Sequence, residues 1–349
     1  KKWEWLGWWP TINAFIILSY YSMILSWTVN YLGFSIKKSW GTDSNAFFHN
    51  DFLKLTESPF ELGGLILPIL IGIIVVWFIN WIICYKGIKG GIEKANKVLL
   101  PTLVVIMIII AIRAVNLEGA SVGLNTLFTP DWSKVLDPKV WIAAYGQVFF
   151  SLSLAMGIMM TYSSYLPKKT DINNSAFMTA FANCGFEFLS AITVFAILGF
   201  MANSSGVPMS EVVSSGVGLA FVVFPQVFSQ MGALGNLIAI LFFVCLLFAG
   251  VTSSVSLIEA VAAPFIDKFG WSRNKVVATI CILGILIGSF YSTGAGLYLL
   301  DIIDNFINNY GIVVVGLLEV LLIGWIASPD VVREHTNEIS YFSHSLIMS

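Results

Sequence analysis

One apolar segment carries two side chains that could bind a cation. Glu187 is the only charged residue between positions 172 and 202, and Asn183 precedes it by one helical turn, which places both side chains on the same helix face. A charged group at the centre of the hydrocarbon region costs roughly 2.5–3.5 kcal/mol or more, so each such group is a functional candidate. Oxygen ligands of this kind suit a hard cation, and an interhelical hydrogen bond is an equally good alternative.

Two mid-span segments combine small residues with hydroxyls. Ala249, Thr252 and Ser253 share one helix face, and their carbonyl and hydroxyl oxygens form a weak-field cluster suited to Na⁺. The segment 149–157 contains serine and glycine residues, which weaken a helix. A break there would expose backbone groups that must line a cavity and not face lipid. Close packing of small residues between helices is the alternative for both segments, and on residue pattern alone the commoner one.

Three further polar residues lie within apolar segments. Glu319 has no polar neighbour on its helix face, and we predict that it holds helices together. Tyr20 and Tyr21 lie mid-span, with Ile17 and Ile24 on the face of Tyr21. A phenol at that depth needs a partner for its proton, and a carbonyl in the core would satisfy it as well as a ligand.

The composition excludes a cytosolic enzyme. Of the 349 residues, 57% are hydrophobic and 11% are charged, against about 25% charged in an ordinary soluble domain. The mean hydropathy is +0.85, and a soluble protein of this size could not bury that much apolar surface. The net charge of −2 argues against nucleic acid as a partner, because binding it takes a basic stripe.

The sequence contains neither a HExxH nor a phosphate-loop motif. We therefore expect neither enzymatic activity nor an organic cofactor. The three histidines fall in loops or in the tail. The four cysteines lie in apolar runs without short spacings, which is typical of buried, reduced thiols. These residues are His49, His335, His344, Cys84, Cys184, Cys245 and Cys281.

The apolar runs predict an all-α polytopic membrane protein with eight transmembrane helices. A spanning helix needs about 20 apolar residues, and runs of that size recur along the chain. We predict spans at residues 11–36, 62–85, 98–115, 140–167, 172–202, about 232–258, 276–291 and 306–327. Residues 1–328 form the transmembrane domain in this prediction, and residues 329–349 form a polar cytoplasmic segment. Both ends look truncated, because the chain starts with Lys1 and its tail is polar and short.

The basic residues predict the orientation. Lys and Arg crowd the short connections around residues 86–97 and 268–275, which lie on the same side as the chain start. Short loops rich in Lys and Arg face the cytoplasm. We therefore expect the first residues of this multi-pass protein to be cytoplasmic, in the inner (plasma) membrane of the cell.

Taken together, these motifs resemble the neurotransmitter:sodium symporter family, in particular its bacterial amino-acid transporters. The resemblance covers nearly the whole chain and implies a fragment that runs from the family's third helix to its tenth. The implied fold is a partial 5+5 inverted repeat with a broken helix at the substrate site. The third helix matches Tyr20-Tyr21 with Ser26-Trp27, the broken sixth matches residues 146–154, the seventh matches Asn183 with Glu187, the eighth matches residues 249–254, and the tenth matches Asp301, Asp304, Gly311 and Glu319.

The resemblance implies two sodium sites. Ser151 and Asn183 would ligate one ion, which also touches the substrate carboxylate. The Ala249 carbonyl, Thr252 and Ser253 would ligate the second. In both sites the remaining ligands would come from the family's first helix, which this sequence lacks.

The resemblance also implies the substrate contacts. The Tyr21 hydroxyl would donate to the substrate carboxylate, and the broken helix would meet the ammonium group. The other residues would shape the site and its apolar pocket. The implied substrate-binding set is Ile17, Tyr21, Ile24, Phe150, Ser151, Ser153, Met156, Ser253 and Leu257.

Two gates follow from the same resemblance. Phe150 would close the site from outside, and Asp304 would pair across the entrance with an arginine on the absent first helix. Asp267 and Tyr165 would belong to the inner gate. Without the resemblance, Asp267 and Asp304 are best interpreted as solvated loop acids.

Three positions bear on how the site opens. Ala155 stands where the family commonly has glycine, which bears on how far the helix unwinds. Met156 stands where an aromatic residue is frequent, and its flexible thioether could make room for a bulkier substrate. Gly91 and Pro101 resemble a pair that lets a helix unwind during inward opening, and the alternative is a plain helix start at Gly91.

These expectations combine into one function. We predict a sodium-coupled symporter that imports a hydrophobic or aromatic amino acid without chloride, because the fixed carboxylate of Glu187 replaces the anion. The partners are then a small amino acid, sodium ions and membrane lipid, and the oligomeric state stays open. One alternative is a cation channel with Glu187, Glu319 and Asp304 along its pore. Another is a membrane sensor that binds an amino acid without transporting it.

Overall fold

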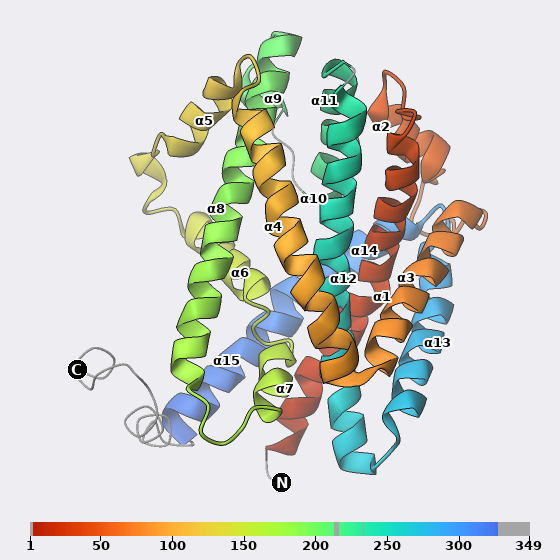
Figure 1. The fold of residues 1–349 in the computed structure, drawn as a ribbon, viewed down its shortest axis with the longest axis vertical. Helices are drawn as coiled ribbons and strands as arrows, with labels where there is room; N and C mark the ends of the chain where they lie inside the picture. Colours follow the sequence, from red (N-terminus) through yellow and green to blue (C-terminus); the bar gives the residue numbers. More distant parts are fainter. Residues whose placement is uncertain (1–2, 213–215, 233, 327–349) are drawn as a thin grey trace.

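The described part of the chain is a bundle of helices (Figure 1). The computed structural model describes all residues except 1–2, 213–215, 233 and 327–349. Within that part the only extended pairing is an isolated bridge between Leu65 and Thr293. The predicted all-α fold is therefore confirmed for the described residues, whereas the polar segment predicted at 329–349 lies outside them.

Seven helices of the described residues are long and apolar enough to cross a membrane. The last is a composite of α-helical and π-helical turns, and α4 is preceded by the π-helical turn η2 (Ile88–Ile92). The seven are α1 (Glu4–Ser35), α3 (Leu67–Tyr85), α4 (Glu93–Val115) with η2, α8 (Ile172–Ser205), α12 (Leu234–Phe269), α13 (Arg273–Tyr291), and the run α14 (Gly296–Phe306), η5 (Ile307–Ile312), α15 (Val313–Leu321) and η6 (Leu322–Ile326).

Shorter helices connect these long ones. Two of them, α6 and α7, lie between the two ends of the bundle, and the others belong to the connections at the end of the bundle shown at the top of Figure 1. They are α2 (Ser44–Ala46), η1 (Phe47–Phe52), α5 (Ala120–Phe128), η3 (Trp132–Lys134), α6 (Pro138–Ser151), α7 (Ile158–Ser164), α9 (Met209–Val212), α10 (Gly216–Gly218), η4 (Leu219–Val223) and α11 (Phe224–Gln230).

Helix α1 is the centre of the packing. It contacts α3, α12, α13 and α15, and it has more buried residues than any other described helix. Small side chains let its neighbours approach: the Ser26 hydroxyl donates to the Ile69 carbonyl at 2.6 Å, and a methyl group at Gly72 would overlap with the Ser26 side chain. In a membrane, where lipid is as apolar as leucine, such close approach is a main source of helix association.

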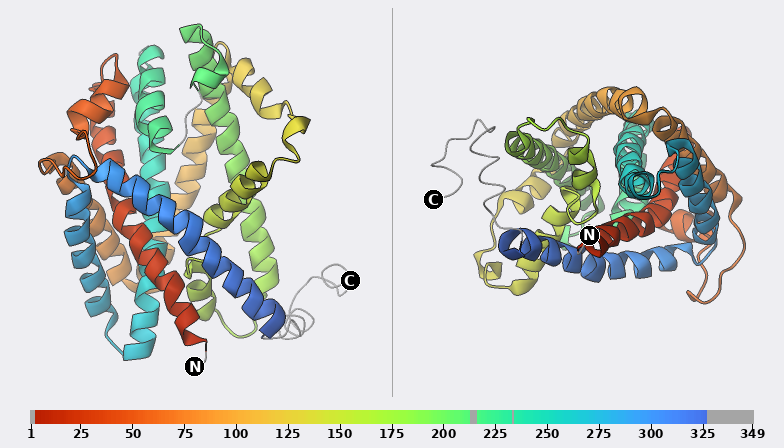
Figure 2. Two further views of the ribbon diagram at one scale, coloured as in Figure 1. Left: turned by 180° about the vertical axis from the view of Figure 1, so that it is seen from behind. Right: turned by 90° about the horizontal axis from the view of Figure 1, so that it is seen from below.

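Close approach at glycine residues also joins the other long helices. A methyl group at Gly250 of α12 would overlap with Leu25 of α1, and one at Gly284 of α13 would overlap with the Trp77 ring of α3. The composite run α14–η6 crosses the bundle obliquely and lies against α1 (Figure 2). The long helices α1, α3, α12 and α13 therefore form one tightly interlocked group.

The structure corrects several predicted span boundaries: α1 begins at Glu4 instead of residue 11, the third span begins at Ile88 instead of residue 98, and two further boundaries shift past charged residues. Helix α12 continues to Phe269, eleven residues beyond the predicted end near Ile258, and the last span begins at Gly296 instead of residue 306. Both predicted boundaries avoided charged residues. The charges are accommodated inside the helices because they have partners: Glu259 pairs with Arg273, and Asp304 accepts a hydrogen bond from Tyr20.

The predicted count of eight spans differs from the seven long helices because of residues 140–167. Helix α6 begins at Pro138, behind an Asp137 side chain that accepts from the Lys139 amide, and ends at Ser151. Helix α7 begins only at Ile158. Neither helix reaches the roughly 17 residues that a membrane crossing takes.

Backbone conformation separates α6 from α7. Ser153 and Ala155 have φ angles of 54° and 58°, and Gly157 has a φ of 72°. The left-handed region suits glycine but puts the Cβ atom of other residues close to the following carbonyl, at about 1–2 kcal/mol per residue. Ala155 is also buried, so surrounding packing holds this conformation in place.

The left-handed φ of Ala155 predicts that glycine is better at this position. We expect Ala155→Gly to raise the unfolding free energy by up to about 1 kcal/mol, because the relief of the steric cost exceeds the entropy that glycine adds to the unfolded chain. Thermal unfolding in detergent measures the change. Ala196→Gly is the matched control, since Ala196 is buried in the regular helix α8 and glycine there is expected to cost about 1 kcal/mol. A lower melting temperature for Ala155→Gly than for the unsubstituted chain contradicts the prediction.

Candidate functional site

A polar cluster bridges α6 and α8 beside the helix break. The Asn183 amide donates to the Ser151 hydroxyl at 3.2 Å and to Glu187 Oε1 at 3.2 Å. The Gln147 amide lies 3.4 Å from the same Glu187 oxygen. The structure thus brings together the three residues that the sequence singled out in this region, and all three are partly buried.

The geometry of this cluster supports both interpretations left open by the sequence. The hydrogen bonds link two helices, as the structural interpretation requires. In both hydrogen bonds the donor is Asn183 Nδ2. The other amide atom, Oδ1, is therefore left as a ligand for a cation next to the Ser151 hydroxyl. No role was predicted for Gln147, although its position one turn before Ser151 on an apolar helix was a usable signal.

The predicted oxygens of α12 also lie together. The Thr252 hydroxyl donates to the Ala249 carbonyl at 2.8 Å, so both oxygens occupy one side of the helix. Ser253, the next residue, is exposed. Among the described residues no cluster of three or more His, Cys, Asp or Glu side chains is suited to a metal ion. Any cation at this position would therefore meet neutral oxygens, which suit Na⁺ better than a divalent ion.

The residues predicted to form the substrate pocket come from α1, the α6–α7 break and α12. The Tyr21 hydroxyl interacts with the Ser253 side chain, and the Tyr21 oxygen lies in ordinary contact distance of Gly250. The apolar members Ile17 and Leu257 are buried. The structure thus juxtaposes the predicted phenol with the α12 hydroxyl cluster.

The break residues differ from one another in exposure. Met156 is buried at 4% exposure, whereas Phe150 is 47% exposed. The neighbouring Phe149 packs against Tyr145 and against Gly316 of α15. Phe150 is thus half-exposed, and its predicted role in closing the site stays a prediction.

Helix α7 is held to α12 one turn away from Thr252. The Tyr162 hydroxyl donates to Ser256 Oγ at 2.8 Å, and the Ser256 hydroxyl donates to the Thr252 carbonyl at 3.0 Å. The helix that follows the break is thus coupled by two hydrogen bonds to the backbone of a predicted sodium ligand.

A buried ion pair that the sequence analysis missed lies beyond α7. Glu259 of α12 is 0% exposed and pairs with Arg273 of α13 through bonds of 2.9 Å and 2.5 Å. The Tyr165 hydroxyl donates to the same carboxylate at 2.7 Å, and Arg273 Nε donates to the Cys84 carbonyl at 3.0 Å. A charge inside a long apolar helix was the signal, but the predicted span ended one residue before Glu259.

The Glu259–Arg273 pair adds a residue next to one of the two predicted inner-gate residues. Tyr165 contacts Glu259, whereas Asp267 is exposed and lies near Glu4 and Lys268 in a shallow cavity at the end of α1. Glu4 and Lys268 form an ion pair of their own. The buried acid at this end of the bundle is therefore Glu259.

Near the middle of α1, a carboxylate and a phenol join two helices. The Tyr20 hydroxyl donates to Asp304 Oδ1 at 2.7 Å, so α1 is tied to α14. Tyr20 and Tyr21 thus point to different partners, as adjacent residues on a helix do. Asp304 is half-buried and bonded, and it is not the solvated loop acid favoured by the residue pattern alone.

Glu319 does not make the bond that the sequence predicted. Its Oε1 is buried and has no hydrogen-bond partner among the described residues. Gly91 lies in the π-helical turn η2 and touches the Ile83 carbonyl of α3 so closely that a methyl group would not fit. Gly91 thus lies inside a π-helical turn and not at a plain helix start, and it allows the close approach of two helices. Unwinding at this position during opening stays a prediction.

Comparisons with known proteins agree with this arrangement. The family model described as "Sodium:neurotransmitter symporter family" matches residues 38–349. An uncharacterized sodium-dependent transporter of Methanocaldococcus jannaschii is 42% identical over 337 residues, covering 97% of this chain and 68% of the relative. The sodium- and chloride-dependent glycine transporter 1 of Xenopus laevis is 30% identical over 325 residues, and the chain spans half of its length.

A solved structure is similar over nearly the whole chain. The crystal structure of MhsT in complex with L-phenylalanine superimposes with a TM-score of 0.81 and 31% identity, covering 99% of this chain and 76% of that one. At that identity the likeness concerns sequence as well as fold.

The Glu259–Arg273 pair predicts a strongly non-additive response to substitution. Arg273→Gln leaves a buried carboxylate without its cation, and we expect it to lower the unfolding free energy by about 3–5 kcal/mol. The double variant Glu259→Gln Arg273→Gln removes both charges and should recover much of that loss. Thermal unfolding in detergent, followed by tryptophan fluorescence, compares the variants.

The control is Lys97→Gln, which breaks the exposed pair of Lys97 with Glu93 and is expected to unfold like the unsubstituted chain. Equal losses for the single and the double variant would show that charge burial is not what makes the pair important.

Proposed function

The chain belongs to the sodium:neurotransmitter symporter family, and from this premise we propose that it imports a hydrophobic or aromatic amino acid together with Na⁺. Members of this family are membrane transporters and not enzymes. The observation that carries the proposal is the contact across the helix break, where Asn183 of α8 bonds to Ser151 at the end of α6. The second element is the neutral oxygen pair of Ala249 and Thr252.

In the proposed mechanism, two Na⁺ ions bind on either side of the substrate. Ser151 and Asn183 hold one ion, and the Ala249 carbonyl, Thr252 and Ser253 hold the other. Each positive charge moved inward gains roughly 2.3 kcal/mol per 100 mV of membrane potential. Two ions then support about a thousandfold accumulation of substrate. Coupling follows if the substrate binds the sodium-loaded state more tightly than the empty one.

The proposed substrate is set by α1, the break and α12. The Tyr21 hydroxyl, next to Ser253, binds the substrate carboxylate, and the free backbone groups around Ser153 bind the ammonium. Ile17, Ile24, Phe150, Met156 and Leu257 surround the side chain. Support for a large apolar side chain comes from the flexible Met156 and from the similar MhsT, which was solved with L-phenylalanine.

We propose that transport does not depend on chloride. The Glu187 carboxylate receives bonds from Asn183 and Gln147, and it places a fixed negative charge one turn from a proposed sodium ligand. That charge balances the ions in place of a bound anion. The chloride-dependent relative from Xenopus laevis is thus proposed to differ from this protein in anion requirement.

The proposed orientation has the first residues of the chain in the cytoplasm of the cell that imports the substrate. The end of the bundle that carries the α3–α4, α7–α8 and α12–α13 connections holds most of the lysines, as the positive-inside rule requires. Phe150 and Asp304 then belong to the outer gate, with Tyr20 as the observed partner of Asp304. Tyr165 and Asp267 belong to the inner gate, and Glu259 is added to it as the acceptor for Tyr165.

Sodium-driven uptake is the direct test of the proposed function. Proteoliposomes with an inward Na⁺ gradient are expected to accumulate labelled phenylalanine, leucine or tryptophan, and the accumulation should vanish when K⁺ replaces Na⁺. Thr252→Val, which removes one proposed ligand, should raise the Na⁺ concentration for half-maximal uptake about tenfold. Thr179→Val is the matched control, because Thr179 is exposed on α8 and bonds only to the Ser175 carbonyl of its own helix.

Three outcomes count against the proposal. Preference for alanine or glycine over the large apolar amino acids would overturn the proposed substrate. Large currents without substrate would indicate a channel. Tight amino-acid binding without accumulation would indicate a sensor.

The proposed role of Glu187 predicts a switch in anion dependence. In Glu187→Ser the fixed charge is gone, so uptake should fall severalfold or more in chloride-free buffer and should return when chloride is added. The unsubstituted protein should transport equally with chloride or gluconate. Glu118→Ser removes an exposed acid outside the cluster and should behave like the unsubstituted protein. Undiminished uptake by Glu187→Ser without chloride would refute the role.

A further inference from the structure

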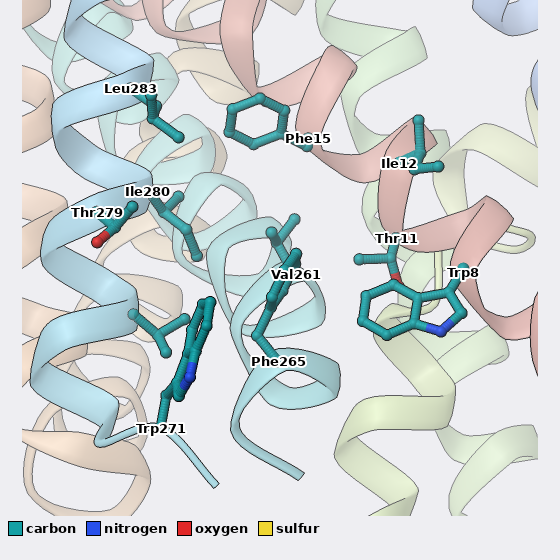
Figure 3. A pocket seen from close by; sticks show the side chains of 11 residues that line it. Trp8, Thr11, Ile12, Phe15, Val261, Phe265, Trp271, Thr279, Ile280 and Leu283 are labelled. Atoms are coloured by element: carbon teal, nitrogen blue, oxygen red, sulfur yellow. The ribbon is translucent and has the colours of Figure 1, made fainter. Parts of the chain in front are cut away.

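An apolar groove separate from the proposed transport site lies between α1, α12 and α13 (Figure 3). One wall is α1 from Trp8 to Phe15, the floor is Val261 and Phe265 of α12, and the opposite wall is α13 from Val276 to Leu283. Trp271, in the α12–α13 connection, stands at the same end as Trp8. None of the proposed sodium or substrate ligands lines this groove.

The groove is apolar along its length. Both walls extend over eight residues, which corresponds to about 10 Å along a helix, and the cavity volume is about 230 Å³. Apart from Thr11 and Thr279, its lining side chains are aliphatic or aromatic, which suits one extended alkyl chain.

Cations and indole rings mark one end of the groove. The Lys268 ammonium lies 5.4 Å from the Trp8 ring, and the Lys275 ammonium lies 5.7 Å from the Trp271 ring. Tryptophan and lysine together are typical of the level at which a membrane meets water. The other end, at Phe15 and Leu283, is apolar, so the groove runs from the interface toward the membrane interior.

Not every charged side chain at this end of the groove has an ion-pair partner. Lys268 is paired with Glu4, Arg273 is used by Glu259, and Asp267 is the remaining acid in the neighbouring cavity. Within the described ranges no carboxylate pairs with Lys275. The groove therefore presents one uncompensated positive charge at its mouth.

We propose that this groove binds one acyl chain of an anionic phospholipid whose headgroup contacts Lys275. The apolar walls contact the acyl chain of the lipid. The lysine selects an anionic headgroup, as basic pockets between membrane helices do. Because α1, α12 and α13 all line the groove, a bound lipid would fill the seam between three interlocked helices.

Photolabelling locates the lipid. The protein is placed in nanodiscs of phosphatidylcholine that contain a little phosphatidylglycerol with a diazirine in one acyl chain, and the labelled peptides are mapped by mass spectrometry. We expect labels on residues 8–15 and 276–283 that unlabelled phosphatidylglycerol removes and additional phosphatidylcholine does not. Labelling no stronger than on the exposed face of α4 would overturn the proposal, as would equal competition by the two lipids.

Variants separate the headgroup contact from the chain contact. Lys275→Gln should lower the preference for phosphatidylglycerol about fivefold, the equivalent of about 1 kcal/mol for one lysine. Lys168→Gln, an exposed lysine at the same end of the bundle, should leave the preference unchanged. Thr279→Trp fills the groove and should abolish specific labelling. An unchanged preference in Lys275→Gln, or a groove found occupied by another protein segment, would overturn the proposal.

Discussion

A helix that stops inside a membrane protein must find partners for its backbone within the protein, because the hydrocarbon supplies none. This requirement governs the surroundings of residues 152–157. Helix α8 supplies Asn183 at the end of α6, α15 supplies Gly316, against which Phe149 packs, and α12 supplies Ser256, which anchors α7. The interruption, which leaves carbonyl and amide groups without helical partners, is thus flanked by three other helices. In the proposed function these groups bind the substrate ammonium.

Buried charged groups likewise need partners within the protein. The buried carboxylate of Glu259 is tolerated because a guanidinium and a phenol neutralise it and satisfy its oxygens, since an unpaired ion would cost several kcal/mol. The carboxylate of Asp304 has a phenol as its partner. Each of these two carboxylates is thus tied to a neighbouring helix by its partner.

Hydropathy and motif spacing predicted the helices well where a helix is uniformly apolar. They were less accurate where a charged residue is paired across the bundle, because a pairing such as Glu259 with Arg273 depends on tertiary structure and leaves no local pattern. Asn183 and Glu187 could be placed together from their helical spacing, whereas Ser151 joined them only through the resemblance to a family. The resemblance assigned no role to Gln147. The left-handed φ of Ala155 could not be foreseen from its type, since alanine favours a regular helix and only the surrounding packing forces it into this conformation.

The glycine contacts among the long helices have a mechanical consequence. At Gly72, Gly250 and Gly284 there is no clearance for even one methyl group, so α1, α3, α12 and α13 have no slack to slide or rotate past one another. Helix α7, by contrast, is fastened to α12 through the hydroxyls of Tyr162 and of Tyr165 at its end. A rearrangement that exposes the interior to one side of the membrane would therefore move other helices relative to this rigid group. Its hinge lies between α6 and α7, where the chain departs from helical geometry.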